Sequence, residues 1–270
     1  MQQGVFDLLA AAGVPVRVGA RGYRPTVGLP DVTAKLLKPQ NVVEMLDAGT
    51  RDLGFAGADW VFEKGASLVE VLDTELDPVR IVAAAPEDMA WPPDRPVRIA
   101  SEYERATKAW IERTGLEASF IRTYGATEVF PPEDADCIVD NTATGSTLAA
   151  NRLVILEDLM RSSTRLYASE QAWADPGKRA RIEDLALLIR SVIEARSRVM
   201  LEVNVAADQL EAVVDLLPCM RHPTVGRLYG EEGYAVKAAV PRKTLASLLP
   251  ALRAAGATDL VVTPCAQIVP

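Results

Sequence analysis

The last part of the sequence carries the pattern that most constrains the fold. From Val199 onward, short apolar runs with strand character are interrupted twice by stretches with helical spacing. The resulting order, strand–helix–strand–strand–helix–strand over about 70 residues, is that of a ferredoxin-like βαββαβ unit. The predicted elements are residues 199–205, 208–217, 224–228, 234–240, 243–255 and 259–263. Such a unit has its own core, so we expect it to form a separate domain.

The preceding residues also alternate strands with helices, which predicts an α/β architecture. Asn41 and Glu44 have the spacing of a capping box and are expected to open a helix. The proline-rich residues 86–96 are expected to cross between two domains. The predicted helices are residues 5–12, 42–48, 102–114 and 177–196, and the predicted strands are residues 52–57, 69–72, 80–85, 98–100, 118–121, 137–140 and 163–168.

Composition and charge exclude several classes of protein. With 49% hydrophobic and 24% charged residues, the chain is expected to be globular. A net charge of −8 argues against nucleic-acid binding, because displacing counterions from phosphates requires a basic surface. Cys137, Cys219 and Cys265 have no metal-ligand spacing and suit a reducing compartment. No apolar run approaches the roughly 20 residues that span a bilayer, so we expect a cytoplasmic protein without membrane partners.

Residues 136–148, Asp-Cys-Ile-Val-Asp-Asn-Thr-Ala-Thr-Gly-Ser-Thr-Leu, are the most informative segment for function. A buried strand ends at Asp140, where ligands of open α/β sheets bind, and this carboxylate can accept hydrogen bonds from ribose hydroxyls. Gly145 permits close backbone approach, and amides at the following helix start favour an anion such as a phosphate. An ordinary strand–turn–helix with a threonine N-cap explains the same residues, so the loop alone leaves both interpretations open.

The same segment resembles the phosphoribosyl pyrophosphate loop of ATP phosphoribosyltransferases, whose pattern is an aspartate, three or four small residues, Gly, any residue, Thr and Leu. Further segments resemble landmarks of that family in the same order, along nearly the whole chain. They are residues 21–25 (RGYRP), 37–41 (LKPQN), 52–59 (DLGFAGAD), 125–128 (GATE), 163–166 (STRL) and 221–225 (RHPTV).

The resemblance implies a fold and a domain organisation. Two α/β lobes arranged as in type II periplasmic binding proteins would form a catalytic unit, followed by the ferredoxin-like βαββαβ regulatory domain. Residues 1–88 would form lobe I, with residues 172–197 packing back on it. Residues 89–171 would form lobe II with the phosphoribosyl pyrophosphate loop, and residues 198–270 the regulatory domain.

The resemblance also implies a reaction. The long form of the enzyme joins N1 of ATP to 5-phosphoribosyl 1-pyrophosphate, releases pyrophosphate, requires Mg²⁺, is inhibited by histidine, and forms homodimers and homohexamers. Adenine N1 has a free lone pair and pyrophosphate leaves as a magnesium complex, so positioning and charge stabilisation would outweigh acid–base catalysis. The single histidine, His222, is accordingly expected to lie in a loop without a catalytic role.

Site residues follow from the resemblance by position. The predicted phosphoribosyl pyrophosphate contacts are Glu128, Asp140, Thr142, Ala143, Thr144, Gly145, Ser146 and Thr147. The predicted ATP contacts are Arg21, Arg24, Lys38, Asp59 and Tyr103, and the predicted histidine contacts are Asn204 and Thr224. Plainer explanations stay open: a solvated basic edge for the cations, helix-start carboxylates for the acids, a packing aromatic for the tyrosine, and strand-end polar residues for the histidine contacts.

The sequence departs from the family pattern at three positions. The family often has an acidic residue where Asn41 stands, an acidic or hydroxyl residue where Ala143 stands, and a basic or small residue where Ser146 stands. The family also begins with a strand and a Lys-Gly-Arg-like turn. Either the natural start lies about ten residues upstream, or the protein lacks this strand and its basic substrate ligands; we favour the first explanation, because a missing strand would expose a sheet edge or a core face. Two other functions remain possible: a catalytically silent protein that binds a nucleotide or amino acid, and the solute-binding protein of a transporter.

Overall fold

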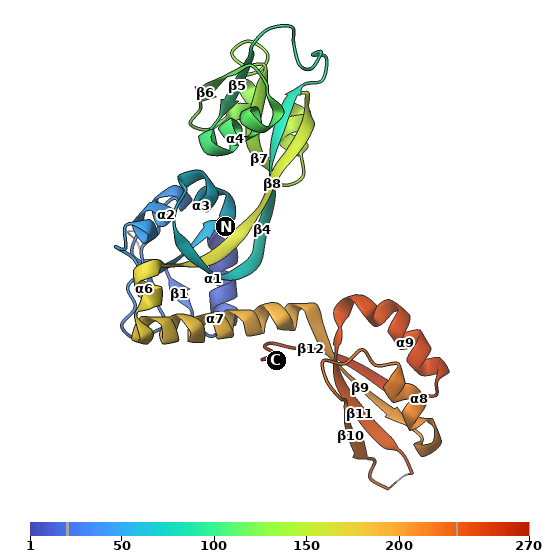
Figure 1. Cartoon of the computed structure of the whole chain (residues 1–270). Coiled ribbons are helices and arrows are strands. Elements are labelled where there is room, and N and C mark those ends of the chain that lie inside the picture. The colour runs from blue at the N-terminus through green and yellow to red at the C-terminus, as the bar shows by residue number, and fades with distance from the viewer. Residues whose placement is uncertain (20–21, 231, 270) are drawn as a thin grey trace. The chain divides into compact units, whose positions relative to one another are not determined.

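The computed structural model describes residues 1–19, 22–230 and 232–269 of the chain (Figure 1). The chain forms two compact units. The first contains Met1–Asp7 and Val16–Ala186, and the second contains Leu8–Pro15 and Leu187–Pro270. Helices α1 (Gln2–Ala11) and α7 (Pro176–Ser197) contribute residues to both units, and both helices were expected from the sequence.

The first unit is built on a six-stranded sheet with the order β3-β8-β4-β7-β5-β6. Its two long strands, β4 (Leu68–Pro86) and β8 (Leu153–Ser169), pair antiparallel along their whole length. Strand β3 (Leu53–Gly57) pairs with one end of β8, and β7 (Cys137–Thr142) pairs with residues 80–84 of β4. The pair β4 and β8 is therefore common to two lobes, lobe I around β3 and lobe II around β7 (Figure 1).

The continuity of β4 corrects two expectations. Residues 69–72 and 80–85 were expected as separate strands, and the crossing between domains was expected at residues 86–96. Both were wrong, because β4 continues through residues 73–79 and has already paired with lobe II at residue 80. The polar residues in between are accommodated by register shifts and by positive φ angles at Glu75 and Asp77, so the strand bends instead of ending.

Lobe I adds helices and a small hairpin to its part of the sheet. The elements are β1 (Val16–Arg17), β2 (Thr26–Val27), α2 (Pro39–Asp47), α3 (Ala58–Lys64) and α6 (Glu170–Ala174). The expected capping box of α2 was wrong: Lys38 is the N-cap, no side chain caps the helix, and Asn41 lies inside it. Proline follows the N-cap directly, and its fixed φ and missing N–H suit the first helical position.

Lobe II places three parallel strands between two helical layers. β5 (Val97–Ser101) pairs in parallel with both β6 (Ala118–Arg122) and β7, while α4 (Glu104–Thr114), the short η1 (Thr127–Val129) and α5 (Ser146–Ala150) follow β5, β6 and β7 in turn. Neighbouring β7 residues Ile138 and Val139 belong to different core clusters, since successive side chains point to opposite sheet faces. Because the strands are parallel, the loops after all three meet at one carboxyl edge.

The second unit confirms the βαββαβ prediction. Its elements are β9 (Arg198–Val205), η2 (Ala207–Gln209), α8 (Leu210–Asp215), β10 (Thr224–Arg227), β11 (Tyr234–Pro241), η3 (Arg242–Thr244), α9 (Leu245–Ala254) and β12 (Thr258–Pro264). The sheet order is β10-β11-β9-β12, with antiparallel pairing throughout. Alternate β9 residues such as Leu201 and Val203 pack against Leu252 of α9, which gives this unit its own core.

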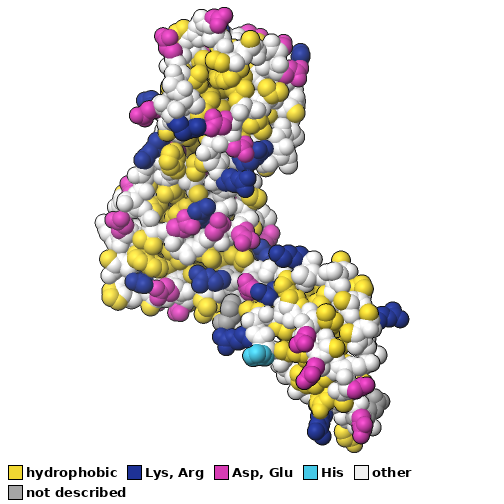
Figure 2. Space-filling view, turned by 45° about the vertical axis from the view of Figure 1, so that its right-hand side comes forward, with side chains coloured by type: hydrophobic (Ala, Val, Ile, Leu, Met, Phe, Trp, Pro, Cys, Tyr) yellow, Lys and Arg dark blue, Asp and Glu magenta, His cyan; other side chains and the backbone are white. Residues whose placement is uncertain are grey.

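Three further features concern the surface charges, the cysteines and the helices. Basic and acidic side chains are interspersed on the face seen in Figure 2. All three cysteines are free thiols, with Cys137 buried. Within the described ranges, no helix has the length and apolar character needed to cross a membrane.

Candidate active site

The loop after β7 has a defined backbone shape. The buried Thr142 closes it, since its Oγ1 accepts the Gly145 amide at 2.9 Å. Gly145 has φ 81° and ψ 0°, a left-handed conformation that favours glycine, and it is the N-cap of α5. The expected alternative of a threonine N-cap is wrong, because no side chain caps this helix. The loop is thus held by Thr142 and leaves the side chains beyond it exposed.

Hydrogen-bond donors collect on the outer side of this loop. Thr144 Oγ1 donates to Ser146 Oγ at 3.0 Å, and Thr147 is exposed beside them. Among the residues that the structure describes, the amides of Thr147 and Leu148 have no acceptor. Ala143 is exposed and adds no polar side chain. Hydroxyls and free amides on one short turn can bind a phosphate group.

Asp140 lies half-buried where β7 reaches this loop. Its Oδ1 accepts the Asn141 amide at 2.7 Å. Burial raises the pKa of its carboxyl to about 6, the Asn141 amide opposes this shift, and the charges of Glu128 and Glu102 add to it. A carboxylate that is costly to ionise and lies at a strand's carboxyl edge is typical of a functional site.

Glu128 and Glu102 reach the same edge from the neighbouring strands. Glu128 lies in η1 after β6, and Glu102 follows β5. The loop before Glu128 is fixed by a 2.9 Å hydrogen bond between the hydroxyls of Thr123 and Thr127. Within the described part of the chain, neither glutamate nor Asp140 forms an ion pair. The edge therefore has negative charge without a compensating cation.

Two predicted ATP contacts meet at the junction of the lobes. Tyr103, the N-cap residue of α4, donates from its hydroxyl to Asp59 Oδ2 at 2.9 Å, and both residues are buried. The Tyr103 ring stacks on Trp60 with 4.9 Å between centroids. Asn141 Nδ2 donates to the Tyr103 hydroxyl at 3.1 Å. Asp59 and Tyr103, far apart in sequence, are thus brought to the phosphoribosyl pyrophosphate loop.

The predicted basic ATP contacts lie on exposed segments of lobe I. Arg24 and Lys38 are exposed, and the Leu36 amide donates to the Tyr23 carbonyl at 3.1 Å, which joins the two segments. Neither cation has an acidic partner among the described residues. Arg21 lies outside the described residues.

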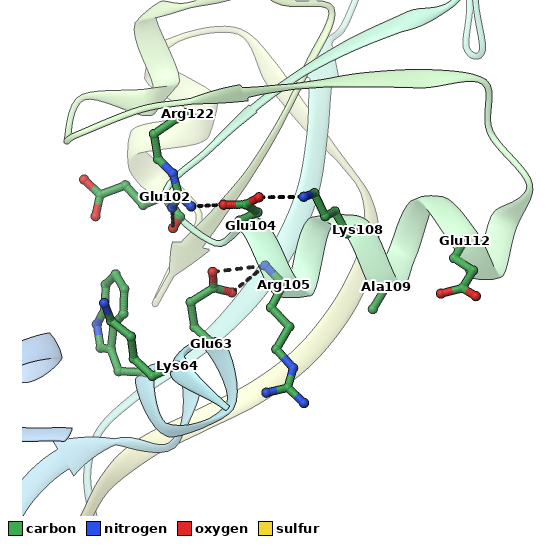
Figure 3. A pocket seen from close by; sticks show the side chains of 10 residues that line it. Glu63, Lys64, Glu102, Glu104, Arg105, Lys108, Ala109, Glu112 and Arg122 are labelled. Carbon is green, nitrogen blue, oxygen red and sulfur yellow. Dashed lines mark hydrogen bonds and ion pairs between the residues drawn. The ribbon is translucent and has the colours of Figure 1, made fainter. Parts of the chain in front are cut away.

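A groove of about 570 Å³ lies beside this junction, between α3 and α4 (Figure 3). Trp60 and Glu63 line it from α3. Glu104 of α4 pairs with Lys108 at 2.6 Å and also with Arg122, so these charges are largely satisfied within the protein. Glu102, Arg105 and Glu112 also line the groove and form no ion pair among the described residues, so the groove adds charges of both signs beside the junction.

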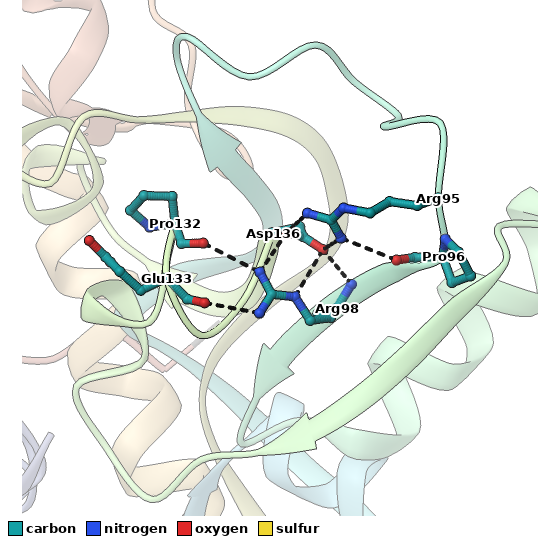
Figure 4. Close-up of polar contacts among 6 residues, drawn as sticks. All are labelled: Arg95, Pro96, Arg98, Pro132, Glu133 and Asp136. Atoms are coloured by element: carbon teal, nitrogen blue, oxygen red, sulfur yellow. Dashed lines mark hydrogen bonds and ion pairs between the residues drawn. The ribbon is translucent and has the colours of Figure 1, made fainter.

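The opposite end of β7 has the reverse electrostatics (Figure 4). The buried Asp136 accepts from both Arg95 Nη atoms, at 2.6 and 2.7 Å, and from the backbone amide of Arg98 at 2.8 Å. The Arg98 guanidinium also bonds it and the carbonyls of Pro132 and Glu133. The Arg95 hydrogen bonds hold the pKa of the Asp136 carboxyl well below its usual range.

The predicted histidine contacts lie in the second unit. Asn204 of β9 pairs with Ala235 of β11 and donates to Asp259 at 3.0 Å. Thr224 of β10 is opposite Lys237, also on β11. Alternation along β11 puts both residues on the sheet face away from the helices, two strands apart.

Sequence reasoning missed one residue that completes the site, Ser162, which donates to Asp59 Oδ1 at 2.6 Å. Trp60, which the sequence places beside Asp59 as a further candidate on the adenine side, forms the wall under Tyr103. Asn141 was placed in the loop but given no role. Nothing in the local sequence marks Ser162, because its partner comes from pairing between α3 and β8 across about a hundred residues of chain.

The architecture is that of a two-lobed α/β protein of the type II periplasmic-binding-protein class, with a ferredoxin-like domain after it. Residues 38–191 match the family model described as ATP phosphoribosyltransferase, and residues 195–267 match the model described as HisG, C-terminal domain. This chain belongs to the ATP phosphoribosyltransferase family, a group of pentosyltransferases in histidine biosynthesis. The resemblance to the long form is confirmed.

Individual relatives agree with this assignment. An ATP phosphoribosyltransferase of Pelotomaculum thermopropionicum is 34% identical, with 100% of this chain and 96% of the relative covered. One from Desulforudis audaxviator is 36% identical with the same coverage. Among solved structures, an ATP phosphoribosyl transferase (HisG:HisZ) complex from Thermotoga maritima matches with a TM-score of 0.64 and 27% identity, covering 71% of this chain and 93% of that one.

Proposed function

We propose that the chain joins N1 of ATP to C1 of 5-phosphoribosyl 1-pyrophosphate, releasing pyrophosphate, at the carboxyl edge of lobe II. The observation that carries this is the loop after β7, where Asp140 stands next to a turn with free amides. Ribose and phosphate are bound together in the sugar substrate, and this loop offers a partner for each within a few residues.

Different residues of the loop bind different parts of phosphoribosyl pyrophosphate. The 5-phosphate binds the amide and hydroxyl of Thr147 and the hydroxyls of Thr144 and Ser146. Asp140 accepts from the ribose hydroxyls, and Thr142 keeps Gly145 in the conformation that opens the turn. Ala143 lies against the substrate through its backbone.

Magnesium is proposed to act with the pyrophosphate. No group of three or more His, Cys, Asp or Glu residues arranged to hold a metal occurs among the described residues. Magnesium commonly uses one or two carboxylates together with substrate phosphates, and the uncompensated Glu128 beside Asp140 fits that mode. When bound, the ion would neutralise charge on the pyrophosphate.

ATP is proposed to approach from lobe I. Arg24 and Lys38 are exposed cations on two joined segments, suited to a triphosphate, and the predicted role of Arg21 belongs with them. Asp59 and Tyr103 form the wall on the adenine side, and this role in ATP binding stays a prediction. No group with acid–base function is needed, because N1 attacks with its own lone pair.

Histidine inhibition and assembly are proposed for the second unit. Asn204 and Thr224 present polar groups on the open face of its sheet, where a small amino acid can be hydrogen-bonded. An open sheet face also suits contacts between copies of the chain, in homodimers and homohexamers.

The test is an ultraviolet assay of phosphoribosyl-ATP formation with ATP, phosphoribosyl pyrophosphate and Mg²⁺, omitting each in turn. We expect product only when all are present, and less product as histidine is added. Binding of both substrates without product, by folded protein, would contradict the proposal and favour a silent binding protein.

A further inference from the structure

A chain of hydrogen bonds connects lobe I to the phosphoribosyl pyrophosphate loop of lobe II. Ser162 Oγ donates to Asp59 Oδ1 at 2.6 Å, and the Tyr103 hydroxyl donates to Asp59 Oδ2 at 2.9 Å. Asn141 Nδ2 then donates to the Tyr103 oxygen at 3.1 Å. The series begins on β8, passes through α3 and the start of α4, and ends at Asn141 near the carboxyl end of β7.

Burial fixes the direction of these hydrogen bonds. Asp59, Tyr103 and Ser162 are exposed by only 5%, 2% and 5%. Burial, with the neighbouring Asp59 charge, raises the pKa of Tyr103, so its hydroxyl keeps its proton and donates to the carboxylate. The phenol oxygen is then left to accept from Asn141. Asp59 and Tyr103 each have a partner on both sides, and the Ser162 hydroxyl is satisfied by Asp59 alone, which donates its backbone amide to Oγ at 3.0 Å.

The helices on which these residues lie are docked on each other. Besides the Trp60–Tyr103 stack, the Glu63 carboxylate of α3 accepts the backbone amide of Arg105 at 3.0 Å, at the start of α4 (Figure 3). It also accepts the backbone amide of Ala106 at 3.2 Å. A carboxylate at a helix N-terminus is favourably placed. The Tyr103–Asp59 bond is therefore part of a packed contact between lobes and not a chance pairing of surface groups.

Asn141 carries this contact to the proposed substrate group. Its backbone amide donates to Asp140 Oδ1 at 2.7 Å, and its side-chain Nδ2 lies 3.3 Å from the same oxygen. One amide side chain thus contacts both the Tyr103 hydroxyl and the Asp140 carboxylate.

We propose that Asp59 and Tyr103 are positioning residues for phosphoribosyl pyrophosphate, which act through Asn141 to orient the Asp140 carboxylate when the lobes are in contact. The inference rests on the proposed function, which assigns Asp140 to the ribose. Tyr103 was predicted as an ATP contact. The inference adds a role in binding the other substrate, because the Tyr103 hydroxyl accepts a hydrogen bond from Asn141.

The test compares Tyr103→Phe, Asn141→Ala and the double variant. Tyr103→Phe removes only the hydroxyl and keeps the ring on Trp60. The exposed Tyr229 in the second unit provides the matched control, Tyr229→Phe. Two quantities are measured: the dissociation constant for phosphoribosyl pyrophosphate by calorimetry, and KM and kcat for each substrate.

We expect Tyr103→Phe to weaken phosphoribosyl pyrophosphate binding about tenfold, the usual effect of one lost hydrogen bond in a buried network, with the KM for ATP changed less than about twofold. The double variant should bind within about twofold of Asn141→Ala, because both changes break the same connection. Tyr229→Phe should match the wild type.

A rise in the KM for ATP alone would overturn the inference and leave Tyr103 as an ATP contact. So would losses that multiply in the double variant, since independent effects would then be at work. Should Tyr103→Phe fold poorly, Asn141→Ala decides, because this side chain is exposed, and unchanged binding would contradict the inference. Absence of product from the wild type would refute the proposed function separately, while the calorimetric comparison still tests the positioning role.

Discussion

Strand β7 has an aspartate at each end, and the two are treated in opposite ways. Asp136, just before the strand, is buried between Arg95 and Arg98, which lower its pKa. Asp140, towards the carboxyl end, is half-buried without a cation among the described residues, and its pKa is raised to about 6. The ionised form of an aspartate is thus stabilised at one end of β7 and destabilised towards the other.

This difference separates a structural charge from a functional one. Asp136, in the loop before β7, is bonded to Arg95 in the segment after β4 and to Arg98 at the start of β5. These arginines compensate its negative charge. The Asp140 carboxylate can still accept hydrogen bonds from the hydroxyl groups of a ligand or bind a cation. The comparison predicts that changes at the two ends affect different properties, stability at one and substrate binding at the other.

The largest effect is expected for Asp140→Asn. Loss of the carboxylate should lower kcat/KM for phosphoribosyl pyrophosphate about a hundredfold, because a charged acceptor for ribose hydroxyls is removed. The thermal midpoint should not fall, since the variant no longer buries a charge. Steady-state assays and thermal unfolding check this, and activity within about twofold of wild type would contradict a functional role for the Asp140 carboxylate.

Asp136→Asn should show the reverse pattern. We expect a loss of about 2 kcal/mol in the free energy of unfolding, because several charge-assisted hydrogen bonds to a buried carboxylate are lost. The matched control is Glu87→Gln, which removes the exposed Glu87–Arg152 pair and should cost less than about 0.5 kcal/mol. Denaturant unfolding measures both, and similar costs for the two variants would contradict a structural role for Asp136.

The pH dependence should separate the two carboxyl groups further. Asp140 must be ionised to accept ribose hydroxyls, so kcat/KM should fall about tenfold per pH unit as pH drops below about 6. The ratio of wild-type to Asp140→Asn rates removes the titration of the substrate itself. A ratio that stays constant from pH 7 to about pH 5 would count against an acceptor role.

Stability should respond at a lower pH. The Asp136 pKa is depressed in the folded state, so its contribution is present above about pH 4, the unfolded value, and is lost as pH falls towards the folded value. The raised pKa of Asp140 acts in the opposite sense, since its effect favours folding at low pH and is lost as pH rises through about 6. Folded but weakly active protein is therefore expected near pH 5.

The smallest effect is expected for Gly145→Ala. Its φ of 81° puts a side chain in the left-handed region, at a cost of about 1 kcal/mol, although no described residue lies within 4 Å of the added Cβ. The turn should relax and weaken phosphoribosyl pyrophosphate binding by about fivefold. Calorimetry checks this, with Gly226→Ala as the control because no described residue lies within 4 Å of its added Cβ and Gly226 lacks a positive φ.

Local sequence patterns predicted much of the fold. The βαββαβ order was evident because the two central strands of the second unit, β9 and β11, alternate buried residues such as Leu201 and Val203 with more exposed ones. Strand β4 was divided wrongly because residues 73–79 contain acidic residues and a proline that locally resemble a turn. Pairing with β8 keeps residues 73–79 within one strand, and the local sequence does not reveal that pairing.

The candidate site was predictable to a similar degree. The phosphoribosyl pyrophosphate loop is contiguous, so strand, turn and helix could be placed from residues 136–148 alone. The connection among Ser162, Asp59 and Tyr103 could not, because it joins residues that are far apart in the sequence and lie on three different elements. Sequence suggested an ATP contact for Tyr103 but gave no sign that its hydroxyl bonds to the loop.

Carboxyl ¹³C NMR titration of Asp136 and Asp140, with and without phosphoribosyl pyrophosphate, shows whether the two carboxyl groups differ in pKa and in their response to the substrate. We expect Asp140 to titrate near pH 6 and its signal to change on adding the substrate, while Asp136 titrates below the usual aspartate range and does not respond. Ordinary pKa values at both positions, or a substrate response at Asp136 and none at Asp140, would contradict the account.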